Sequence, residues 1–178
     1  MNYKKLILLT ASFIAVIALS VGSTMAYFSY SQSVKNTFSL GNVKIYLTET
    51  DFKPSDALNL VPNSVVKKNP VVNIASGSQD CFVRVKVVIS GIDAEKLDID
   101  YNTGGSRTWV KLGDYYYYKT KLEDEKNKDK TTPLFTRVKI KDDVTEGADT
   151  SFDIDIIAEA IQSEGFNSAT EAFNSLNS

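Results

Sequence analysis

The chain of 178 residues contains no histidine. Without imidazole it cannot form a Ser-His-Asp or Cys-His catalytic arrangement or the His-Glu-x-x-His motif of zinc peptidases. The acids of Asp98-Ile99-Asp100 and Asp153-Ile154-Asp155 alternate with isoleucine, so each pair is expected on the solvated face of a strand rather than as a catalytic dyad. We therefore expect a protein that is not an enzyme and that has no cofactor, catalytic residue or metal ligand set. No segment has the Asp-x-Asp-x-Asp-Gly spacing of a calcium loop, and bound calcium is left open.

Cysteine is also scarce, and positive charge is not in excess. The single cysteine, Cys81, excludes an internal disulfide framework, so a hydrophobic core must stabilise the fold. Cys81 itself is expected to be a small apolar residue at the start of a strand. The formal net charge is −2, and it becomes −4 once residues 1–26, with Lys4 and Lys5, are removed. This balance argues against a nucleic-acid partner, which requires a basic face.

The N-terminus has the pattern of a secretory signal peptide. Lys4 and Lys5 precede an apolar run over 6–19, and small residues follow it. Thr24 and Ala26 are the small residues expected to flank the cleavage site, which makes Tyr27 the first residue of the mature chain. The alternative is an uncleaved membrane anchor, although the run falls short of the roughly 20 apolar residues that span a bilayer. We predict a signal peptide over 1–26, secretion to the extracellular matrix or cell surface, and one mature domain over 27–178.

Residues 28–40 alternate regularly between apolar and polar side chains. The even positions carry the apolar residues Phe28, Tyr30, Val34, Phe38 and Leu40, interrupted by Gln32 and Asn36, while the odd positions are polar. Such alternation predicts a β-strand with one apolar and one wet face. After Gly41-Asn42 the apolar residues change to odd positions, which predicts a turn that carries the chain onto the opposite sheet.

The rest of the chain reads as short strands separated by turn residues. The firmest is 81–89, with Val83 and Val85 on one face, and a second long strand is expected over about 151–162. Further strands are expected at 65–66, 71–74, 97–101, 109–112, 115–119 and 134–140, and a short C-terminal helix with a capping box at Ser168 and Glu171. This order predicts an all-β, antiparallel two-sheet sandwich, jelly-roll-like, with a few short helices.

Gly113-Asp114 joins two of these strands in a predicted hairpin rich in aromatic residues. Four consecutive tyrosines would place two rings on each face of the second strand. One interpretation is a surface aromatic platform that binds sugar, made by Trp109, Tyr115, Tyr116, Tyr117 and Tyr118. The other is a stiff strand with amphipathic rings that pack partly in the core.

Several motifs resemble the TasA and camelysin (CalY) family of Firmicutes. The resemblance rests on the cleavage junction at 24–29 (Thr-Met-Ala-Tyr-Phe-Ser), on 36–45, 70–73, 80–85, 109–118 and 134–135, and on 158–166 (Ala-Glu-Ala-Ile-Gln-Ser-Glu-Gly-Phe). It implies a jelly-roll fold, processing by a dedicated signal peptidase of the SipW type, and assembly into extracellular biofilm-matrix fibres. In such fibres the N-terminal strand of one subunit completes the sandwich of its neighbour.

On this basis residues 27–38 are expected to be the donor strand, with Phe28, Tyr30 and Val34 entering the next copy. The expected partners are the chain itself, as a head-to-tail homopolymer, the signal peptidase, and a minor subunit that anchors or nucleates the fibre. Two alternatives stay open: a camelysin-type metalloprotease, disfavoured because the chain has no histidine, and a monomeric cell-surface adhesin that uses the tyrosine-rich hairpin.

Overall fold

Ten β-strands dominate the computed structural model, which describes residues 36–40, 42–57, 60–143 and 152–177. The strands are β1 (Asn36–Leu40), β2 (Ile45–Thr48), β3 (Val65–Lys67), β4 (Val71–Ile74), β5 (Cys81–Ser90), β6 (Leu97–Asp98), β7 (Trp109–Leu112), β8 (Tyr115–Tyr118), β9 (Arg137–Ile140) and β10 (Asp153–Gln162). The helices are short: η1 (Pro54–Ala57), η2 (Ala94–Lys96), α2 (Ala169–Asn174) and η3 (Ser175–Asn177).

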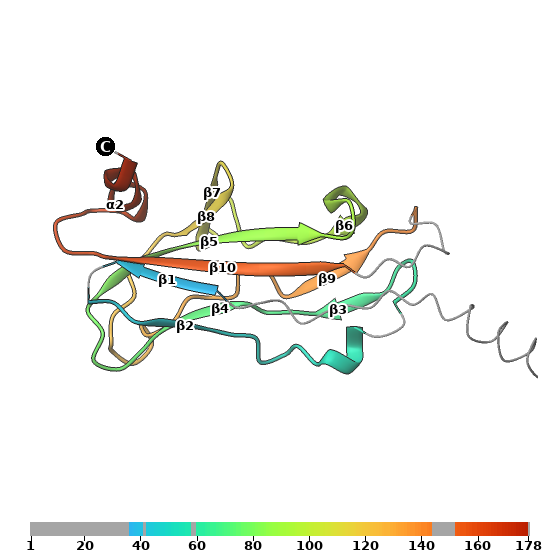
Figure 1. Cartoon of the computed structure of the whole chain (residues 1–178), viewed down its shortest axis with the longest axis horizontal. Coiled ribbons are helices and arrows are strands. Elements are labelled where there is room, and N and C mark those ends of the chain that lie inside the picture. Colours follow the sequence, from blue (N-terminus) through green and yellow to red (C-terminus); the bar gives the residue numbers. More distant parts are fainter. Residues whose placement is uncertain (1–35, 41, 58–59, 144–151, 178) are drawn as a thin grey trace, which may run out of the picture.

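The strands form two layers (Figure 1). The first is a five-stranded sheet in the order β1-β10-β5-β8-β7, and the second combines the pair β2-β4 with the three strands β3-β9-β6. Backbone hydrogen bonds between 68–72 and 131–136 connect the two parts of the second layer, for example from the Thr131 N–H to the Val72 carbonyl (2.9 Å). All pairs of described strands are antiparallel except β1 with β10. The predicted all-β sandwich is confirmed.

The core lies between the layers and follows the period-two pattern of the sequence. β5 and β10 pair over their full length, from Cys81 opposite Gln162 to Ser90 opposite Asp153. Every second residue of β10 points inward and is buried, including Ile154 and Ile156. Cys81 is fully buried at the start of β5, as expected, and burial raises the pKa of its thiol to about 12.

The hairpin β7–β8 turns at Gly113, whose φ of 59° is the left-handed conformation that glycine adopts without strain. Two other strands differ from expectation. The strand expected at 97–101 stops at Asp98, and the one expected at 134–140 begins only at Arg137. Leu134 is nevertheless buried and donates its N–H to the carbonyl of Pro70, so the segment before β9 packs in the core without joining the regular ladder.

Helix α2 closes the outer face of the five-stranded sheet. Its capping box is present: the Ser168 hydroxyl accepts from the Glu171 N–H (3.2 Å), and the Glu171 carboxylate accepts from the Asn167 N–H (2.9 Å). Ala172 and Phe173 pack into a second apolar cluster on this face. Leu176 lies beyond α2, in η3, and is 48% exposed.

Candidate functional site

The expected cleavage site (Thr24, Ala26, Tyr27) and the apolar donor residues (Phe28, Tyr30, Val34) lie outside the described residues. The end of the expected donor strand is described, and it differs from expectation. Residues 36–38 belong to β1, which runs parallel to β10 of the same chain, with Asn36 opposite Ile157 and Leu40 opposite Ile161. A donor strand over 27–38 is therefore too long as long as β1 stays paired with β10, because residues 36–38 already pair within their own chain.

β1 is an edge strand of the five-stranded sheet. Among the described residues it has a strand neighbour, β10, on one side only. Thr37 lies opposite the fully buried Ala158 and is itself exposed. β2, the next strand, belongs to the other layer, as the change of alternation after Gly41 predicts.

The aromatic residues of the hairpin do not form a surface platform. Trp109, Tyr116, Tyr117 and Tyr118 retain at most 8% of their exposure, and Tyr115 is half-buried. Trp109, Tyr116 and Tyr118 point into the main core, whereas Tyr117 on the opposite face is covered by Phe173 of α2. Alternation alone would leave the face of β8 that carries Tyr115 and Tyr117 exposed. The prediction of a surface platform is wrong because α2 covers this face.

An ion pair lies beneath α2. The Arg84 Nε and Nη2 atoms are both 2.6 Å from Glu159 Oε2, and Nη1 donates to the Tyr117 hydroxyl (3.3 Å). The guanidinium also stacks on the Phe173 ring, 4.3 Å from its centroid. Burial by itself lowers the pKa of Arg84, but the bonds to Tyr117 and Glu159 outweigh it and raise the pKa above its ordinary value. This cluster fixes α2 on the sheet.

A second ion pair is almost fully enclosed in the other layer. Lys68 Nζ lies 2.7 Å from Glu49 Oε1, and the two side chains are 1% and 5% exposed. The neighbouring Asn69 bonds to the Thr50 hydroxyl and to the Asp51 N–H, which ties the segment after β2 to the link between β3 and β4. Lys68 stands at an even position, like the buried Val66 and Val72, so alternation places all three side chains on the same inward face. This alternation is the sequence signal that could have predicted a buried lysine.

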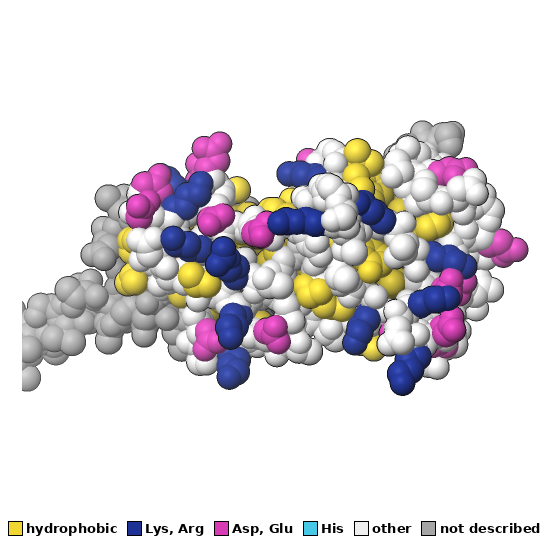
Figure 2. Space-filling model, turned by 180° about the vertical axis from the view of Figure 1, so that it is seen from behind, with side chains coloured by type: hydrophobic (Ala, Val, Ile, Leu, Met, Phe, Trp, Pro, Cys, Tyr) yellow, Lys and Arg dark blue, Asp and Glu magenta, His cyan; other side chains and the backbone are white. Residues whose placement is uncertain are grey.

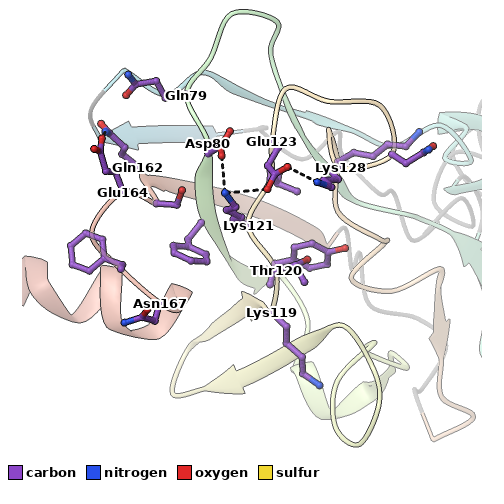
Figure 3. Close-up of a pocket in the computed structure, with 17 residues that line it drawn as sticks. Gln79, Asp80, Lys119, Thr120, Lys121, Glu123, Lys128, Gln162, Glu164 and Asn167 are labelled. Atoms are coloured by element: carbon purple, nitrogen blue, oxygen red, sulfur yellow. Dashed lines mark hydrogen bonds and ion pairs between the residues drawn. The ribbon is translucent and has the colours of Figure 1, made fainter.

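A cleft of about 970 Å³ lies at one end of the sandwich (Figure 3). We call it the end cleft. It is bounded by the start of β5, the loop after β8 and the segment that links β10 to α2. Phe82, Tyr118, Leu122 and Phe166 give it apolar walls, and amide and hydroxyl side chains such as Gln79, Thr120 and Asn167 line it as well.

The charges of the end cleft are largely paired with one another. Lys121 bonds to Asp80 (2.8 Å) and to Glu123 (3.1 Å), and Lys128 bonds to Glu123 (2.7 Å). The ammonium groups of Lys128 and Lys121 lower the pKa of Glu123, and Asp80 and Glu123 raise that of Lys121. Most of the residues 123–130, which carry charges of both signs, are exposed. The cleft is suited to binding a polar, uncharged group.

Three further observations complete the description. The described residues hold no group of three or more Cys, Asp or Glu side chains placed to bind a metal ion. Within the same ranges, no helix has the length and apolar character needed to span a bilayer. The face turned away in Figure 1 carries charged side chains of both signs with hydrophobic ones between them (Figure 2).

Within the described residues, the fold is an all-β sandwich with β1 at one edge of the five-stranded sheet and a cleft at one end. No family model, curated protein or solved structure matches the chain.

Proposed function

We propose that the chain is a secreted structural subunit that polymerises into extracellular fibres. In this proposal signal removal frees the segment 27–35, and the segment of one copy completes the sandwich of the next. The resemblance to the TasA and camelysin family supports a role in the biofilm matrix and processing by a SipW-type signal peptidase. A contact of this kind joins two different surfaces and does not close, so copies add head to tail into a filament.

The observation that carries the proposal is the position of β1. An edge strand marks a place where the chain can leave its own sheet and enter another, because unpaired backbone groups at sheet edges pair with added strands. Within the freed segment, residues 27–34 contain no charged side chain and alternate between apolar and polar positions, and Lys35 is its one charged side chain, next to β1. Such a segment is suited to transfer into a neighbour without burying an unpaired charge.

Apolar burial is one source of free energy for this contact. Burial of Phe28, Tyr30 and Val34 contributes about 4 to 8 kcal/mol at roughly 25 cal/mol per Å² of apolar surface, before ordering costs. The backbone hydrogen bonds of an added strand supply direction and register rather than most of the energy.

The test compares two substitutions on opposite faces of the same segment. Phe28→Asp places a charge on the apolar face, and Ser29→Asp places the same charge on the polar face. We expect the purified chain 27–178 and its Ser29→Asp variant to form fibres under negative-stain electron microscopy. Phe28→Asp should stay monomeric by sedimentation, with the thermal unfolding midpoint of the parent.

Fibres from Phe28→Asp at the parent's concentration would contradict donation by this segment. A parent chain that stays monomeric when it is concentrated at neutral and mildly acidic pH would contradict polymerisation itself.

A further inference from the structure

The enclosed pair of Lys68 and Glu49 is held in contact by anchored backbone. Lys68 Nζ lies 2.7 Å from Glu49 Oε1, and the two side chains are 1% and 5% exposed. The Lys68 N–H donates to the Thr136 carbonyl (3.2 Å), and the amide of the next residue, Asn69, donates to the hydroxyl of Thr50 (3.1 Å). An amine and a carboxyl group are thus fixed side by side inside the protein.

The surroundings of the pair make its uncharged form accessible. Burial removes hydration from the ammonium and from the carboxylate, so transfer of one proton from Nζ to Glu49, which removes both charges, is less unfavourable than in water. The Phe52 ring, 5.2 Å from Lys68 Nζ, attracts the ammonium, but this attraction is weaker than the hydration that is lost. The uncharged amine is a nucleophile, and a protonated carboxyl group is a better electrophile than a carboxylate.

Condensation of the two groups balances without a further reactant. One proton passes from the Lys68 ammonium to Glu49, Nζ attacks Cδ, and the bond from Cδ to one carboxyl oxygen breaks. That oxygen leaves as water, with the transferred proton and a second proton from Nζ. The product is a side-chain amide between Nζ and Cδ, and no atom is oxidised or reduced.

The distance between the reacting atoms is short. A C–O bond adds about 1.2 Å to the separation of Lys68 Nζ and Glu49 Oε1, so Nζ and Cδ are at most about 4 Å apart. Well-oriented groups within one molecule reach effective molarities of about 10⁵–10⁸ M. The enclosure also keeps water away from the product and so slows its hydrolysis. Proximity and exclusion of water together favour an amide that the same groups do not form when they are free in solution.

A covalent bond at this position would supply what the chain otherwise lacks. Cys81 is the single cysteine, so no disulfide forms within the chain. An amide from position 49 to position 68 joins the segment after β2 to the link between β3 and β4. Like a disulfide, it closes a loop and lowers the entropy of the unfolded chain.

The geometry points to a modification site: we propose that Lys68 and Glu49 condense after folding to an intramolecular amide, with release of one water molecule. The freshly folded chain holds the ion pair, and the amide accumulates as the folded chain ages. The reaction takes place within one copy, so it does not depend on the proposed polymerisation.

Intact-mass spectrometry follows the reaction. One sample of the purified chain is held folded at physiological temperature and pH for several weeks, and a second is held unfolded in guanidinium chloride. We expect the folded sample to lose the mass of one water molecule and the unfolded sample to keep its mass, because only folding brings the two groups together. Chymotrypsin cleaves between them, after Phe52 and Leu60, and should release the peptides of Glu49 and Lys68 as one linked species.

Two controls separate this amide from loss of water elsewhere. The double variant Glu49→Leu, Lys68→Met lacks both reacting groups and should keep its mass when it is held folded. Within the parent chain, Lys121 lies 2.8 Å from Asp80, but both side chains are 44% exposed. Water competes at this exposed pair, so we expect no linked peptide there.

A parent chain that keeps its full mass throughout the folded incubation would overturn the proposal. Equal loss of water from the double variant would overturn it as well, and so would a linked peptide that maps to positions other than 49 and 68.

Discussion

The Glu49–Lys68 pair and the ion pairs of the end cleft use the same chemical groups in opposite surroundings. Lys68 and Glu49 are enclosed between β3, β4 and the segment after β2, whereas Lys121 and Asp80 are each 44% exposed at the end of the sandwich. Water screens the exposed charges and can replace either partner, but it cannot reach the enclosed ones. The comparison teaches that loss of one partner costs much more stability at the enclosed pair than at the exposed pairs.

The largest effect is expected at the enclosed pair. Lys68→Met removes the ammonium and leaves the Glu49 carboxylate buried, which should lower the free energy of unfolding by about 3–5 kcal/mol. Urea unfolding measures this directly. The double variant Lys68→Met, Glu49→Leu should recover most of the loss, because no charge then remains inside. A single variant within about 1 kcal/mol of the parent would show that water reaches the pair.

Loss of the ion pair beneath α2 should cost less stability than loss of the enclosed pair and more than loss of an exposed pair, because Arg84 and Glu159 are 14% and 22% exposed. Arg84→Met removes the bonds to Glu159 and Tyr117 and should cost about 1–3 kcal/mol. Hydrogen exchange should quicken first in α2. The control is Lys86→Met on the same face of β5, whose partner Asp114 is 76% exposed, with an expected cost under about 1 kcal/mol. Unchanged exchange in α2 would contradict its anchoring by Arg84.

The smallest effect is expected at the end cleft, and it depends on pH. Lys128 and Lys121 lower the pKa of Glu123. A carboxylate with a lower pKa in the folded chain stabilises the fold at pH values above its unfolded-state pKa of about 4.3. This stabilisation is lost as the pH falls through the folded-state pKa. Lys121→Gln combined with Lys128→Gln should therefore lower the unfolding midpoint slightly near pH 7 and leave it unchanged near about pH 2.5. An equal decrease at both pH values would point to lost packing.

Alternation predicted the elements that depend on local pattern. β5, β10 and the β7–β8 hairpin are present within two residues of the expected bounds, and the capping box of Ser168 starts a helix as expected. It could not predict where α2 docks, which is why Tyr117 was expected at the surface. The docking of α2 depends on how well its surface fits that of the sheet, and this fit produces no periodic pattern in the sequence of either element.

The sites were harder to predict because they join distant segments. The end cleft combines residues near 80, 120 and 165, and charged loop residues such as Glu123 and Lys128 give no sign of it. The burial of Lys68 was not predicted, although alternation places this side chain on the inward face. A lysine is almost never fully buried without a partner, and its partner Glu49 lies 19 positions earlier in the sequence. The site residues expected at Phe28, Tyr30 and Val34 stay a prediction.

The parallel pairing of β1 with β10 joins the first described strand of the chain to the last. During synthesis the ribosome delivers Asn36 long before Ile157, so β1 must wait for more than a hundred further residues before its partner exists. Contacts between such distant positions form late in folding, after the loop that separates them has closed. The pairing that completes this side of the five-stranded sheet therefore cannot form before β10 has been synthesised.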